Sequence, residues 1–151
     1  MSRLRWILAA PLLTSGCLGL LLLAPDGKDR QERFDEALDR WNAHALTTYT
    51  YEYTRSCFCL PLPPVRVDVR DARVVRVTDL NTGADLDTAM VRLPTIDDLF
   101  DLVRYAIDED ARMLEVTYDE TWGFPARGSI DISVNIADEE TAFSVTAFTP
   151  G

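Results

Sequence analysis

The alternation between two kinds of hydrophobic spacing restricts the fold of this chain more than any other feature. Residues 32–46 and 96–107 place apolar side chains three and four positions apart, the spacing of one helix face. After each of these segments apolar side chains recur at every second position, as in Tyr49, Tyr51 and Tyr53, which is the spacing of a half-buried strand. The pattern predicts a helix and three strands, then a second helix and three more strands.

The expected strands are joined by short connections, which favour antiparallel pairing. They cover residues 48–55, 65–70, 73–78, 114–118, 130–136 and 143–147. We expect Thr95 to cap the second helix, with Asp98 completing a capping box. Because most strands are apolar on one side only, both helices should cover one face of a mainly antiparallel sheet. The predicted fold class is α+β, in the order α-β-β-β-α-β-β-β.

The first 24 residues are typical of an export or anchoring signal. Arg3 and Arg5 precede a run without charge over residues 6–25. Small residues lead to Cys17, which resembles a bacterial lipoprotein signal, where the chain is cut before the cysteine and the thiol carries lipid. Residues 6–24 are also about long enough to span a bilayer as a retained anchor, and simple secretion is a third alternative.

All three alternatives leave the rest of the chain outside the cytoplasm, because Arg3 and Arg5 hold the N-terminal end inside. Residues 25–30 are short and polar, and we expect them to form a tether. Residues 31–149 should then form a single domain at the outer face of a bacterial membrane, which the protein contacts through its N-terminal anchor.

Charge and residue counts exclude several classes of function. Against 15 Lys and Arg residues stand 25 Asp and Glu residues, so the formal charge is −10 and nucleic acid is not an expected partner. The chain has a single histidine, His44, which excludes a two-histidine metalloprotease motif. With no glycine-rich phosphate loop either, we expect no cofactor.

Cys57 and Cys59 are the sharpest chemical feature. Outside the cytoplasm paired cysteines are usually oxidised. On a flat strand, however, Cα atoms two residues apart lie about 6.5–7 Å from each other, at or beyond the disulfide limit. A bridge therefore needs a bent strand end, which the prolines at positions 61, 63 and 64 permit. The alternatives are two buried thiols, or a redox or metal role for the pair.

Two possible metal sites are weak. Cys57, Cys59 and His44 match no zinc spacing and lack a fourth ligand. Residues 79–87 alternate oxygen ligands as a calcium loop does, but Ala84 and Met90 occupy the positions of the required glycine and bidentate acid. We therefore expect no metal, and a solvated polar loop at residues 79–87.

Aromatic residues supply the remaining candidates. Trp41 and the alternating tyrosines of residues 49–53 have the spacing of core positions rather than of a ligand groove. Trp122 and Phe124 lie on a glycine-containing loop, and loops on a rigid sheet often carry recognition. We predict that Trp122 and Phe124 are exposed contact residues.

Several stretches together resemble the bacterial family catalogued as domain of unknown function 6174. These are Trp41, residues 49–53, residues 55–59 with the Cys-Phe-Cys segment, residues 95–100, Tyr118-Asp119, and residues 123–125 leading to Ile130-Asp131. Phe124 stands where the family pattern has a tyrosine. The resemblance implies an exported or lipid-anchored protein and lends no catalytic residues. It also implies that Cys57 and Cys59 belong to the family pattern.

The absence of a convergent acid–base or nucleophile set favours a non-enzymatic function. The leading hypothesis is a membrane-tethered binding or structural module with a protein or small-molecule partner that the sequence does not identify. The alternative is a thiol–disulfide or metal-handling protein that uses Cys57 and Cys59.

Overall fold

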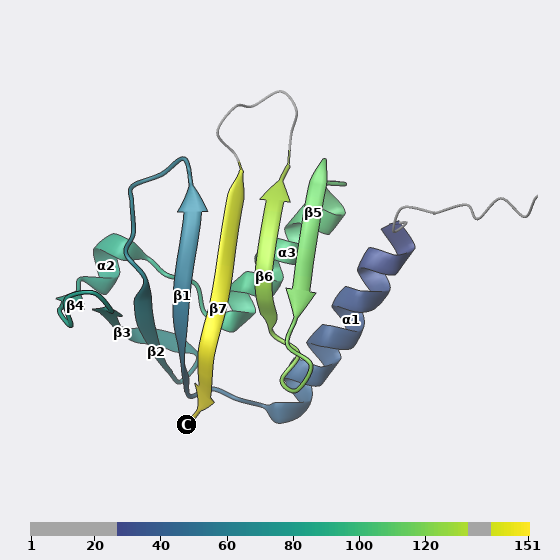
Figure 1. Ribbon diagram of the computed structural model, residues 1–151. Coiled ribbons are helices and arrows are strands. Elements are labelled where there is room, and N and C mark those ends of the chain that lie inside the picture. Colours follow the sequence, from purple (N-terminus) through teal and green to yellow (C-terminus); the bar gives the residue numbers. More distant parts are fainter. Residues whose placement is uncertain (1–26, 133–139) are drawn as a thin grey trace, which may run out of the picture.

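The computed structural model describes residues 27–132 and 140–151, which build a seven-stranded antiparallel sheet (Figure 1). The strands are β1 (Tyr49–Cys57), β2 (Val65–Arg70), β3 (Arg73–Asp79), β4 (Asp85–Leu86), β5 (Met113–Tyr118), β6 (Pro125–Asp131) and β7 (Thr141–Pro150). The helices are α1 (Gly27–His44), α2 (Thr88–Val91) and α3 (Ile96–Asp108). The strand order is β4-β3-β2-β1-β7-β6-β5, so β1 is the central strand, and β7, although it comes last in sequence, lies inside the sheet between β1 and β6.

The predicted α+β class is confirmed, with the two long helices on one face of the sheet (Figure 1). The alternating tyrosines of β1 are buried, and the ring of Tyr49 meets the indole of Trp41 on α1 edge to face at 5.4 Å. Phe34 of α1 and Phe100 of α3 meet in the same way at 5.8 Å. These residues form the core that the spacing predicted, and the opposite face of the sheet is open.

Helix α3 is fixed at its start by three kinds of hydrogen bond. Thr95 and Asp98 form the predicted capping box, which satisfies two backbone N–H groups. The buried hydroxyl of Tyr49 accepts from the backbone N–H of Ile96 at 3.0 Å. The hydroxyl of Tyr51 donates to the backbone carbonyl of Pro94. The central strand therefore positions the helix through tyrosine hydroxyls as well as through packing.

The sheet has seven strands rather than six, because the expected solvated loop contains a further short strand. Asp79 stabilises a tight turn, accepting at Oδ1 from the backbone N–H of Asn81 at 2.8 Å. The chain then returns along β3 as β4 and enters α2, which Asp87 caps. A two-residue strand and a four-residue helix are too short to show periodicity in a sequence.

Strand β6 begins earlier than the period-two pattern predicted. It starts at Pro125, inside the segment expected to be a connection, and ends at Asp131. Gly128 lies within it because a Cβ at this position would clash with the ring of Phe143 on β7. Proline and glycine are rare in strands, so the sequence pattern did not predict a strand over this half of β6. Residues 133–136 of the expected strand lie outside the described residues.

The N-terminal predictions are only partly within the described residues. Helix α1 begins at Gly27 rather than at residue 32, so much of the segment expected as a tether is helical. The expected signal or anchor, including Cys17, lies outside the described residues. Among the helices of residues 27–132 and 140–151, none combines the length and apolar character needed to cross a bilayer.

Candidate functional site

A disulfide closes the end of β1. Cys57 and Cys59 are bonded, with their Cα atoms 5.2 Å apart. This distance is shorter than the spacing along a flat strand, because β1 ends at Cys57 and residues 58–60 bend. The predicted bent strand end is therefore present. Phe58, between the two cysteines, is 81% exposed, and Leu60 after them is 86% exposed.

Beneath this disulfide, on the helix side of the sheet, lies a hollow of about 500 Å³ that we call the disulfide hollow. It is lined by Tyr53, Arg55, Cys57, Phe58, Cys59, Pro94, Asp98, Leu99, Leu102 and Thr141. Strand β1 contributes one wall and the first turns of α3 contribute another. The lining presents apolar and polar surface in similar amounts, and Arg55 is the one cationic residue that the described part of the chain contributes to it.

Arg55 reaches the hollow because it continues the buried face of β1. Tyr53, Arg55 and Cys57 alternate along the strand, so all three point toward the helices. The Nε atom of Arg55 is buried, and no described group accepts a hydrogen bond from it. Buried polar atoms in proteins nearly always have a partner, so a donor without one is unusual among the described residues.

The electrostatics of the hollow are mixed. Burial raises the pKa of Tyr53 to about 12, while the nearby Arg55 guanidinium acts in the opposite direction. Asp98 contributes a carboxylate, but its Oδ2 already accepts from the backbone N–H and the hydroxyl of Thr95, each at 2.8 Å. The Asp98 carboxylate therefore serves the helix cap, whereas Arg55 has no ion-pair partner among the described residues.

The predicted contact residues Trp122 and Phe124 do not form an exposed pair. Phe124 is only 3% exposed, because its ring packs against Phe148 at 4.8 Å and Trp41 at 6.5 Å, so its expected exposure was wrong. Trp122 is half-buried, with its ring 4.6 Å from that of His44. The loop is drawn onto α1 by Gly123, whose φ of +86° and tight fit against the helix exclude other residues.

His44 is placed far from the cysteines. It ends α1, and its Nε2 donates to the backbone carbonyl of Thr121 at 3.3 Å. Thr121 lies in the turn that joins β5 to β6, at the opposite end of the sheet from the disulfide. In the described part of the chain, no three side chains among His, Cys, Asp and Glu converge as a metal site requires.

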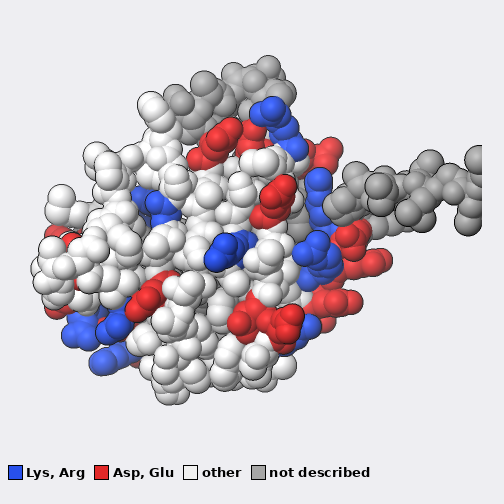
Figure 2. All heavy atoms as spheres, in the orientation of Figure 1, with Lys and Arg blue, Asp and Glu red and all other residues white. Residues whose placement is uncertain are grey.

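The open face of the sheet carries a second hollow, of about 480 Å³, over β1, β7, β6 and β5. Its lining combines small hydroxyl residues, such as Thr54, Ser129 and Ser144, with Arg55, Glu115 and Arg127 and with apolar surface. Figure 2 shows this face as largely uncharged, with isolated charges, and the acidic side chains gathered over α1. Hydroxyl groups in an open hollow are readily solvated, so this surface is a weaker candidate.

Of the features found, the disulfide was one of the alternatives that the sequence left open, and the hollow was not predicted. The available signal was the position of Arg55, a cation in phase with the buried tyrosines of β1. A comparison with known proteins gave no significant match to a curated protein or to a solved structure. A family model does match residues 33–150, which is most of the chain and includes the whole disulfide hollow. The chain therefore belongs to the family of unknown function DUF6174.

Proposed function

We propose that this protein is a non-enzymatic binding module, tethered through its N-terminus to the outer face of a bacterial membrane, and that it binds its ligand in the disulfide hollow. The observation that carries the binding site is the side chain of Arg55, which lines the hollow and has no ion-pair partner among the described residues. Ligand pockets typically combine apolar walls with a few convergent polar groups. The tether is supported by the uncharged run of residues 6–25 and by the small residues before Cys17.

The chemistry of the hollow indicates the class of ligand. A guanidinium binds carboxylates with paired, charge-assisted hydrogen bonds. Leu99 and Leu102 offer an apolar wall beside it. The ligand is therefore a small molecule, or the end of a peptide, that joins a carboxylate to an apolar group.

The test uses 4-phenylbutanoate, a soluble carboxylate with an apolar ring, titrated onto the full chain in nanodiscs. We expect binding to shift the NMR signals of the Leu99 and Leu102 methyl groups. Hydrogen bonds to charged groups contribute about 1.5–3 kcal/mol, so Arg55→Gln should weaken binding roughly 10- to 150-fold.

Arg66→Gln is the matched control, because Arg66 is an exposed arginine on the open face that pairs with Glu52 at 3.5 Å. It should leave binding unchanged. Equal binding by wild type, Arg55→Gln and Arg66→Gln would contradict the proposed site, and circular dichroism of each variant separates lost binding from lost fold.

Thiol–disulfide exchange is a second candidate function, favoured by the exposure of Cys59. A thiolate of a partner would attack Cys59 Sγ and form a mixed disulfide, and the electron pair of the broken bond would leave on Cys57 Sγ as a thiolate. Equilibration of the chain with glutathione buffers measures the reduction potential. A value below about −300 mV marks a structural staple and rejects this function, whereas a higher value supports it.

A further inference from the structure

We infer that the loop of residues 58–64 is a second membrane contact, which inserts Phe58 and Leu60 into the surface of the bilayer that holds the N-terminus. The inference rests on the proposed membrane tether and adds an orientation to it. It is carried by three observations: the exposure of the two side chains, the rigidity of the loop, and the position of the start of α1.

The loop presents large apolar side chains to solvent without any charge beside them. Phe58 is 81% exposed and Leu60 is 86% exposed, and residues 56–65 include no charged residue. Exposed apolar groups that are contiguous mark interaction sites, whereas scattered ones need no explanation. In a chain of formal charge −10, an uncharged tip is the part that meets a bilayer without repulsion from anionic headgroups.

The loop is also held rigidly. The Cys57–Cys59 disulfide closes it at one side, and the prolines at positions 61, 63 and 64 restrict its backbone on the other. The backbone carbonyl of Pro64 accepts from the N–H of Leu80, which fixes the return into β2. A preorganised loop loses little conformational freedom on insertion, so more of the gain from burying Phe58 and Leu60 remains.

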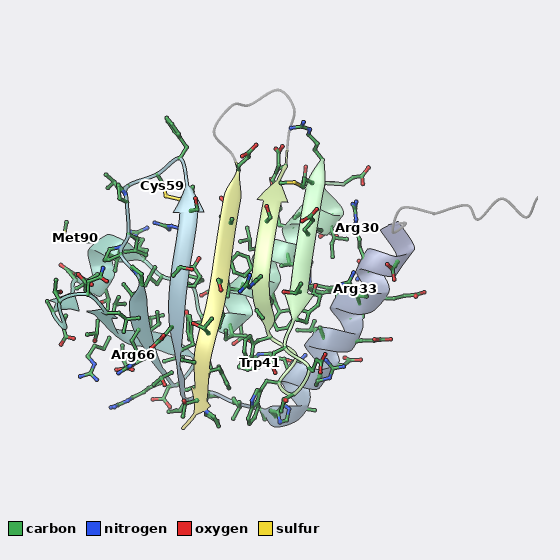
Figure 3. All side chains as sticks on the ribbon, viewed as in Figure 1. Arg30, Arg33, Trp41, Cys59, Arg66 and Met90 are labelled. Carbon is green, nitrogen blue, oxygen red and sulfur yellow. A yellow bond between two sulfur atoms is a disulfide. The ribbon has the colours of Figure 1, made fainter. Side chains whose placement is uncertain are left out.

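The register of the sheet places the start of α1 at the same end as this loop. Cys57 pairs with Thr141, Thr141 with Ile130, and Ile130 with Leu114, so these four residues form one rung across the sheet. Leu114 at the end of that rung lines a small cavity together with Arg30 in the first turns of α1. Figure 3 shows Cys59 and Arg30 both toward the upper end of the molecule.

Because the loop and the start of α1 lie at the same end of the sheet, we assign the loop's partner as the membrane that holds the N-terminus. The uncharged run of residues 6–25 joins the domain just before Gly27, where α1 begins. A membrane that holds this run therefore lies against the end of the sheet that carries Phe58 and Leu60. Figure 2 shows acidic side chains gathered over α1, whereas residues 56–65 include no charged residue.

The experiment uses the full chain in vesicles of phosphatidylethanolamine and phosphatidylcholine, the latter brominated near the top of its acyl chains. Interfacial apolar groups reach about 5–10 Å into the headgroup boundary, which is the depth that this bromine reports. In Phe58→Trp, the emission that the new indole adds to the wild-type signal should be largely quenched. In Phe58→Trp combined with Leu60→Asp, that quenching should be lost.

Thr149→Trp is the matched control, because Thr149 is exposed and lies at the far end of β7 from the rung of Cys57. Its added emission should not be quenched. Flotation of the wild-type chain tests the tether separately: a chain that does not float refutes tether and inference together. A chain that floats while Phe58→Trp stays unquenched, or is quenched no more than Thr149→Trp, refutes the membrane contact alone. A concentration-dependent blue shift of the added indole without quenching assigns the loop to a second copy instead and also overturns the inference.

Discussion

Replacing Tyr49 with phenylalanine should destabilise the domain by removing one hydroxyl from the start of α3. That hydroxyl accepts from the backbone N–H of Ile96 at 3.0 Å, and both residues are at most 1% exposed. The phenylalanine ring fills the same space, so packing is retained and the loss is confined to the hydrogen bonds of the hydroxyl, with the Ile96 N–H and with the Thr95 side chain. A buried N–H left without a partner costs about 1–3 kcal/mol.

The measurement is the free energy of unfolding from urea denaturation, followed by circular dichroism. Tyr105→Phe is the control, because Tyr105 lies on the same helix and is 54% exposed. It should change stability by less than about 0.5 kcal/mol, as surface substitutions usually do. Thermal unfolding should show the same order, with Tm falling by roughly 2–4 °C for each kcal/mol lost.

One result would refute this reasoning. If Tyr49→Phe and Tyr105→Phe unfold at the same urea concentration, the N–H of Ile96 has another acceptor in the variant. The central strand would then position α3 through packing and the capping box alone.

Three further predictions follow from the same structure. Gly123→Ala should lower the free energy of unfolding by more than about 1 kcal/mol, because it combines an unfavourable positive φ with a clash against the backbone of Ala37, and the urea midpoint measures this. The free energy of unfolding should fall as the pH rises from 10 toward about 12. Burial raises the pKa of Tyr49 and Tyr53 in the folded state to about 12, whereas the phenols of the unfolded chain ionise at 10.0, so the unfolded state is favoured between these values. A urea midpoint that stays constant between pH 10 and 12 would contradict the burial argument. Cys17→Ser should abolish incorporation of labelled fatty acid into the chain if Cys17 carries lipid, whereas equal labelling of variant and wild type would place the lipid elsewhere.

Elements with a strict local period were predictable from the sequence. Strand β2 alternates valine with charged residues and has the predicted bounds, and the capping box of Thr95 and Asp98 lies where the motif indicated. Strand β4 and helix α2 were missed because they are shorter than one repeat of any pattern. The first half of β6 was missed because its glycine is explained only by the ring of Phe143, a residue distant in the sequence.

Parts of the candidate site could likewise be predicted from local sequence, and parts could not. The spacing left a Cys57–Cys59 bridge as one of several alternatives, and the following prolines permitted the bend that a bridge needs; the structure contains the disulfide. The disulfide hollow depends on the meeting of β1 with α3, which no local pattern reports. The exposure of Phe124 was predicted wrongly for the same reason: a loop rich in turn residues folds back onto α1, and only tertiary packing determines that outcome.

The position of β7 between β1 and β6 has a consequence for how the protein is made. Strands β1 to β4 and strands β5 and β6 are separate antiparallel groups until the final residues of the chain insert between β1 and β6. The core beneath them is therefore incomplete until residues 141–150 have been made, and a chain truncated before Thr141 exposes two unpaired strand edges. Under the export that we propose, this late closure would leave the chain unfolded, and so fit for transport, until residues 141–150 have crossed the membrane.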